Sequence, residues 1–231
     1  MLSFYPISVA YLIAAAALFA LAAWSVSSYN RSKSPLTKYL AISGLLAGAY
    51  FLVNSVPFIL TSDINSLKII VGIGSVAYYA VLVVQAKLLW YLLFGDKRDY
   101  RWLYSPVLIL AIIAYFISLN ASWQLQPTLS SGALNYNWPP ILLLLDAVLD
   151  LLFIGVGVCV LRLGNSAKNF RGKVRIFSLS LAYIAGGILG VYNALFQNGP
   201  NNSPSMFLIY ALVFGLLLVV SLIGRFQAGE Q

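Results

Sequence analysis

Histidine is absent from the 231 residues of this chain, and cysteine occurs once, as Cys159. Without histidine, the protein has no haem with His axial ligands, no His-containing zinc or copper site and no Ser-His-Asp triad. A single cysteine cannot form an intramolecular disulfide, so Cys159 is most simply a small residue of the interior. We therefore expect no metal, no cofactor and no catalytic residues, and the sequence argues against an enzyme.

Charged residues are scarce: they make up 9% of the chain, whereas 61% is hydrophobic and the mean hydropathy is +0.88. A soluble domain has about 25% charged residues. This composition predicts an all-α polytopic membrane protein that forms a single transmembrane domain over residues 1–231. Seven apolar runs reach the ~20 residues that a spanning helix needs: about 4–27, 39–61, 69–94, 102–120, 139–161, 176–197 and 206–224. The first run is too long for a signal peptide and no positive charge precedes it.

The basic residues indicate the orientation. We assigned the loops alternately to the two sides of the membrane. Of the 14 Lys and Arg, 12 then fall on one side, Lys68 alone falls on the other, and Lys87 falls within a span. The positive-inside rule then places the N-terminus outside and the C-terminus in the cytoplasm, and we expect a multi-pass protein of the plasma membrane. The net charge of +8 suits anionic lipid headgroups at the inner loops, with no need for nucleic acid. The inner residues are Arg31, Lys33, Lys38, Lys97, Arg98, Arg101, Arg162, Lys168, Arg171, Lys173, Arg175 and Arg225.

Two carboxylates interrupt the apolar stretch 139–162: Asp146 and Asp150. Residues four apart on a helix share one face, so both acids point into the same sector of the protein. A charge that faces lipid costs several kcal/mol, so this sector should be the interior of the bundle or a wet cavity. Low dielectric and a like charge one turn away both disfavour double ionisation of the pair.

Other polar side chains fall at a similar depth in the outer half of the spans. Asn54, Asn193, Tyr78, Tyr79 and the two acids lie about 6–16 Å from the outer ends of their spans, at 1.5 Å rise per residue. If their faces converge, they line a cavity that is open to the outside. The alternative is that a neighbouring helix satisfies each polar group separately.

Lys87 lies further inward, in the third span. Because Cα–Cβ bonds tilt toward the N-terminus of a helix, its side chain starts out directed at the midplane. We expect Lys87 to be an internal partner of the acids through a water or a tyrosine. The alternative is that its side chain snorkels to the cytoplasmic headgroups.

A weak internal similarity relates spans one to three to spans five to seven. Asn54 lies six residues after Gly48, and Asn193 lies six residues after Gly187. This spacing predicts a 3+1+3 parallel repeat, in which the fourth span is a linker. The plan and the chain length resemble the SWEET sugar transporters, and a seven-span plan that starts outside also resembles the microbial rhodopsins. Neither resemblance extends to sequence motifs, because the mid-span prolines of the first and the retinal lysine of the second are missing, so no functional residue is carried over.

Three functions fit these patterns. The favoured one is transport of a small solute or cation, in which Asp146 and Asp150 bind the substrate or relay protons. The second is a receptor or sensor that binds a ligand in the same cavity and signals through a partner protein. The third is an accessory subunit of a larger membrane complex, in which the polar groups are only interhelical contacts. The partner could be another protein or a second copy of this chain, as a homo-oligomer. The longest outer loop, about 121–138, has no charged residue and is expected to form irregular chain or a short hairpin.

The distribution of basic residues predicts the outcome of single-cysteine labelling in a Cys159→Ser background. A membrane-impermeant thiol reagent added to intact cells should label a cysteine in loop 121–138 and leave one in loop 164–173 unlabelled, because the second loop faces the cytoplasm. Labelling of the second loop with protection of the first would reverse the orientation.

Overall fold

The computed structural model describes residues 6–55, 64–95, 101–124, 128–130, 133–135, 138–164, 170–196, 212–213 and 215–217. Within these ranges it contains six helices that are long and apolar enough to cross a membrane. This confirms a multi-pass membrane protein made of transmembrane helices. The helices are α1 (Pro6–Ser32), α2 (Pro35–Ser55), α4 (Ile64–Phe94), α5 (Arg101–Gln124), α6 (Pro140–Gly164) and α7 (Phe170–Phe196).

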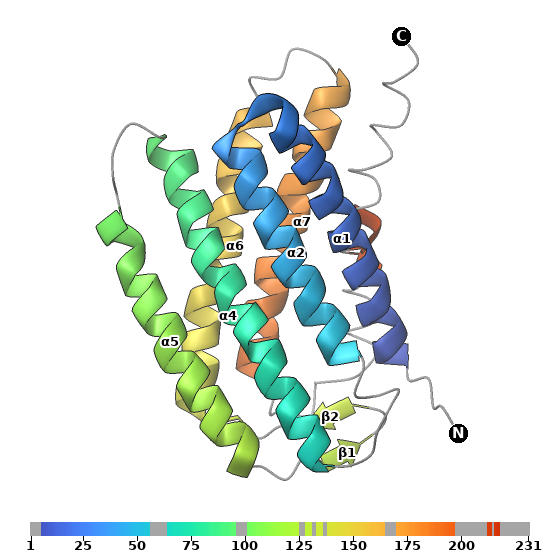
Figure 1. The fold of residues 1–231 in the computed structure, drawn as a ribbon, viewed down its shortest axis with the longest axis vertical. Helices are drawn as coiled ribbons and strands as arrows, with labels where there is room; N and C mark the ends of the chain where they lie inside the picture. The colour runs from blue at the N-terminus through green and yellow to red at the C-terminus, as the bar shows by residue number, and fades with distance from the viewer. Residues whose placement is uncertain are drawn as a thin grey trace.

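The first six predicted spans coincide with these six helices, apart from their ends. The seventh predicted span, 206–224, lies largely outside the described residues, and only 212–213 and 215–217 are seen, as helix. In the loop between α5 and α6, β1 (Thr128–Ser130) pairs antiparallel with β2 (Ala133–Asn135), so this loop contains the short hairpin. The hairpin lies at the lower end of the bundle in Figure 1.

A tight turn joins α1 to α2. Lys33 has a φ of 53°, in the left-handed region, and its N–H donates to the Tyr29 carbonyl at 2.7 Å. Pro35 then begins α2, where the N–H that proline lacks would have no partner within the helix. The two helices therefore run antiparallel as direct neighbours.

Five of the helices form a closed ring. Along the ring α1 contacts α2, α2 contacts α4, α4 contacts α6 and α6 contacts α7. The ring closes where Ala17, Leu18 and Leu21 of α1 pack with Ala182 of α7. Helix α5 lies outside the ring, against α4 and α6 (Figure 1). The inner faces of α1, α2, α4, α6 and α7 therefore surround a common axis.

Glycine allows the closest helix approaches in the ring. A Cβ on Gly44 of α2 would lie 3.0 Å from the Leu18 carbonyl oxygen of α1. A Cβ on Gly187 of α7 would lie 2.9 Å from the Ile154 backbone nitrogen of α6. Small residues at such contacts let backbones meet where lipid provides no hydrophobic driving force.

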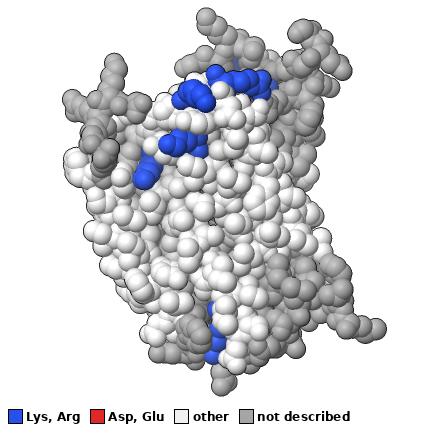
Figure 2. Space-filling view, viewed as in Figure 1, with Lys and Arg blue, Asp and Glu red and all other residues white. Residues whose placement is uncertain are grey.

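The described cations lie at the two ends of the bundle, apart from Lys87. Lys68 is at the end where α4 begins, and the others gather at the opposite end, where α1 meets α2 and α6 meets α7 (Figure 2). This is the separation on which the predicted orientation depends. The gathered residues are Arg31, Lys33, Lys38, Arg162, Lys173 and Arg175.

Gly157 tests the close approach of α6 and α7. An added Cβ there would lie 2.9 Å from the Ser180 carbonyl oxygen and 3.0 Å from the Ile184 nitrogen, both backbone atoms. We expect Gly157→Ala to lower the stability in detergent by about 1–3 kcal/mol, the cost of overpacking. Gly72→Ala is the matched control, since its Cβ would meet only the Leu119 Cδ1 methyl at 3.3 Å. Equal melting temperatures for the two variants would contradict the tight contact.

Candidate functional site

Asp146 and Asp150 lie on the face of α6 that is turned into the bundle. Asp150 is 4% exposed and Asp146 is half-buried. The opposite face carries the exposed aliphatic residues and is the surface available to lipid. These residues are Ile141, Leu144, Val148, Leu151 and Val158.

Two consecutive tyrosines of α4 hold the two carboxylates. The Tyr78 hydroxyl donates to Asp150 Oδ1 at 2.8 Å, and the Tyr79 hydroxyl donates to Asp146 Oδ1 at 3.0 Å. Successive side chains on a helix diverge by about 100°, so this pair straddles the side of α4 that faces α6. Their ring centroids are 5.1 Å apart. The structure thus brings together four of the predicted site residues, and we call these four the acidic site.

Gly190 of α7 makes room for Asp150. A Cβ at position 190 would overlap the Asp150 carboxylate and would lie 2.9 Å from Asp150 Cβ. Any larger residue there would displace the carboxylate from Tyr78. The glycines of this span are expected to permit a close crossing or a bend, and at Gly190 the close crossing also accommodates an acid.

Further tyrosines surround the acidic site. The Tyr50 ring of α2 lies 5.4 Å from the Tyr78 ring, and the Tyr115 ring of α5 lies 6.4 Å from the Tyr79 ring. Tyr50 is also close enough to interact electrostatically with both carboxyl groups and with Tyr11 of α1. The sequence pattern does not single out these rings. The signal that could have found Tyr50 is its position one turn before the polar Asn54.

Asn54 and Asn193 lie one turn beyond Tyr50 and Gly190, toward the C-terminal ends of α2 and α7. The Asn54 Nδ2 donates to its own helix, at the Tyr50 carbonyl 2.8 Å away, and would lie 2.9 Å from a Cβ on Gly74 of α4. Asn193 follows Gly190 by three residues, so the two share a face of α7. Its Oδ1 is buried and has no hydrogen-bond donor among the described residues. Asn193 therefore leaves an acceptor unsatisfied near the level of Asp146.

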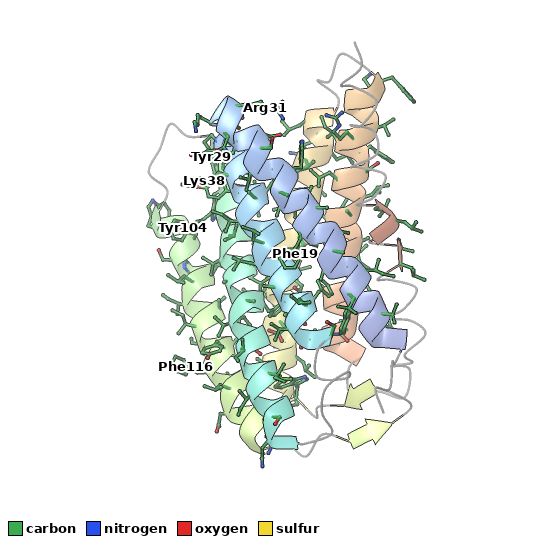
Figure 3. The ribbon with its side chains drawn as sticks, turned by 45° about the vertical axis from the view of Figure 1, so that its right-hand side comes forward. Phe19, Tyr29, Arg31, Lys38, Tyr104 and Phe116 are labelled. Atoms are coloured by element: carbon green, nitrogen blue, oxygen red, sulfur yellow. The ribbon has the colours of Figure 1, made fainter. Side chains whose placement is uncertain are left out.

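The structure does not bring Lys87 to the acids. Its Nζ lies over the Tyr104 ring, 4.7 Å from the centroid. Tyr104 is in the first turn of α5, at the end of the bundle where Arg31 and Lys38 also lie (Figure 3). A cation–π contact at this level stabilises the ammonium without the midplane desolvation that the acids would require. Lys87 is thus placed toward the basic end of the bundle, in place of the expected contact with the acidic sector.

The two carboxyl groups of the acidic site have no basic partner in the described structure. No lysine or arginine in the described ranges is paired with either carboxylate; each accepts a hydrogen bond from one phenol. Nor does a third acidic, histidine or cysteine side chain join them to form a metal-binding group within those ranges. Two carboxylates with aromatic neighbours can take up a proton or a small cation of low charge.

Comparison of the chain with protein-family models, curated proteins and solved structures finds no match.

The pairing of tyrosines with acids can be tested by two double-mutant cycles in detergent. We expect Tyr78→Phe and Asp150→Asn to be coupled by about 0.5–3 kcal/mol, because each removes one side of the same hydrogen bond. The crossed cycle, Tyr79→Phe with Asp150→Asn, is the matched control and should show weaker coupling. Equal coupling in both cycles, measured by thermal unfolding, would contradict the observed pairing.

Proposed function

We propose that the protein transports a small cation across the membrane and that the acidic site binds it. The observation that carries the proposal is the position of two carboxyl groups inside the bundle, Asp150 buried and Asp146 half-buried, each bonded to a phenol and neither to a lysine or arginine in the described structure. Intramembrane acids of this kind are typical of ion pathways and proton relays.

The magnitudes favour an additional positive partner. Desolvation of an ionised carboxylate in a protein interior costs several kcal/mol. One hydrogen bond to a charged group returns about 1.5–3 kcal/mol. One phenol for each of Asp146 and Asp150 therefore leaves part of the cost uncompensated. A proton or a bound cation supplies the missing charge, and exchange between the two would couple transport to a proton gradient.

The proposed entry runs along polar residues that are not fully buried. Asp146, Tyr78, Tyr50, Asn54 and Asn193 are each half-buried. Phenol faces and amide oxygens are suitable for a cation that has lost part of its hydration shell. These residues would line its entry.

The proposal includes the full topology. We infer seven spans, with 206–224 as the last, the N-terminus outside and the plasma membrane as the location, from the cation bias and the length of the apolar runs. The 3+1+3 repeat is supported by one feature of the packing. Gly48 of α2 lies against Phe19 of α1, and Gly187 of α7 lies against Ile154 of α6, so the glycine of each half faces the preceding helix.

An accessory subunit is the second candidate. The phenol donors to both acids favour it, because they give each carboxylate a partner within the chain. In that function the acidic site joins α4 to α6 and moves no ion. A ligand-sensing receptor would bind the cation without moving it.

Flux measurements in proteoliposomes test the proposal. We expect uptake of at least one of sodium, potassium and methylammonium, or proton movement reported by an enclosed pH dye. The double variant Asp146→Asn, Asp150→Asn should lower that flux at least about tenfold, because neutral amides do not supply the negative charge. Tyr91→Phe on α4 is the control, since Tyr91 contacts Tyr39 and lies outside the acidic site. Binding without flux would indicate a receptor, and neither binding nor flux would leave the accessory subunit.

A further inference from the structure

A second polar group lies in the ring, inward of the acidic site. Ser43 of α2, Gln85 of α4 and Tyr183 of α7 are 5%, 0% and 8% exposed. Gln85 Nε2 donates to Ser43 Oγ at 2.5 Å, and the Tyr183 hydroxyl oxygen lies beside these two side chains as an acceptor. We call these three residues the inner cluster.

The inner cluster lies below the acidic site along the axis of the ring. Each member is seven residues inward of a residue around Asp150. Residues seven apart nearly eclipse one another on a helix and lie about 10 Å apart along it. The same faces of three helices therefore carry both groups. The three pairs are Ser43 with Tyr50, Gln85 with Tyr78, and Tyr183 with Gly190.

Apolar residues separate the inner cluster from its surroundings. Leu82 is fully buried one turn inward of Tyr78, between the two polar levels. On the cytoplasmic side the cluster borders a core of aliphatic side chains that also includes Tyr183. Buried apolar side chains thus border the inner cluster on both sides along the axis. The aliphatic residues are Leu40, Leu88, Val156 and Val160.

Gln85 retains an unused acceptor. Its Oε1 is buried and has no donor among the described residues, although the rest of the amide is engaged with Ser43. A buried amide oxygen without a partner destabilises a fold, so a leucine of similar volume would pack there at lower cost. A functional role for the Gln85 amide oxygen explains why a glutamine occupies this buried position.

We propose that Ser43, Gln85 and Tyr183 form a second binding position for the transported cation, between the acidic site and the cytoplasmic end. This inference rests on the proposed transport function. The amide oxygen and two hydroxyl oxygens are neutral ligands for a monovalent cation or acceptors for an ammonium group. Since the inner cluster has no formal charge, it holds the cation less tightly than the two carboxylates do, which allows release onward.

The experiment measures equilibrium binding and flux of one cation, the one among those tested above that the wild-type protein transports. Gln85→Met removes the acceptor at similar side-chain length, and Gln85→Glu keeps an acceptor at the same place. We expect Gln85→Met to lower the flux about tenfold or more while equilibrium binding at the acidic site changes less than about threefold. Gln85→Glu should retain more flux than Gln85→Met. Ser118→Ala is the control, because Ser118 is a buried polar residue bonded to Ser75 but belongs to α5, outside the ring.

Access to the inner cluster gives a second readout that does not need flux. In a Cys159→Ser background, Ser43→Cys should react with a small cationic methanethiosulfonate at least about tenfold faster than Ser118→Cys, since only position 43 is on the proposed path. Two results together would overturn the second binding position while leaving the proposed function in place: a Gln85→Met variant that transports at the wild-type rate, and equal reaction rates of Ser43→Cys and Ser118→Cys.

The two proposals fail in different ways. A wild-type protein that binds and moves no cation of the panel ends the proposed transport function. The relative rate at Ser43→Cys then still decides whether a cationic probe reaches the inner cluster. Loss of both binding and flux in Gln85→Met, with an inert Ser43→Cys, would show that the inner cluster only holds the bundle together.

Discussion

The position of Asp150 constrains the rest of the bundle. Its carboxylate needs a donor from α4, which Tyr78 provides, and a neighbour without a side chain on α7, which Gly190 provides. Three helices therefore meet at one level around this carboxylate. Because burial of a carboxylate costs several kcal/mol, a shift that broke the Tyr78 contact would be costly unless a proton or a cation compensated for it.

The ring of five helices explains how such a level can exist in a small protein. Contacts through Gly44 and Gly187 bring α1 to α2 and α6 to α7, so little space is filled by side chains at these crossings. The axis of the ring then holds polar groups from several helices, with Leu82 between the two levels. Helix α5 supports α4 from outside. Polar groups stacked at separate levels, with apolar residues between them, are an arrangement suited to stepwise movement of an ion.

The sequence predicted the class of fold and part of the site. The lengths of the apolar runs predicted six of the helices. The distance of each polar residue from the end of its span predicted similar depths for the four residues of the acidic site, which the structure brings together: Asp146, Asp150, Tyr78 and Tyr79. Depth is an axial coordinate, however, and it contains no information about which faces meet. This is why Tyr50 and Gly190 were not predicted as site residues.

The position of Lys87 also could not be predicted without knowing which helix faces meet. The direction of its Cβ indicates only where the side chain starts, and a four-carbon stem can turn either way. The face of Tyr104 becomes available only when α5 folds back along α4, a tertiary contact that the local pattern does not contain. The inner cluster of Ser43, Gln85 and Tyr183 was missed for a related reason, since each residue alone is an ordinary polar residue of a span.

The central claim is that a cation compensates the charge of Asp146 and Asp150. Cation-induced infrared difference spectroscopy tests it directly, because it reports on the carboxyl groups themselves. We predict that adding the transported cation to the purified protein perturbs carboxyl bands that disappear in Asp146→Asn and Asp150→Asn, whereas a neutral solute of similar size leaves them unchanged. Carboxyl bands that do not respond to any cation of the panel would contradict the account.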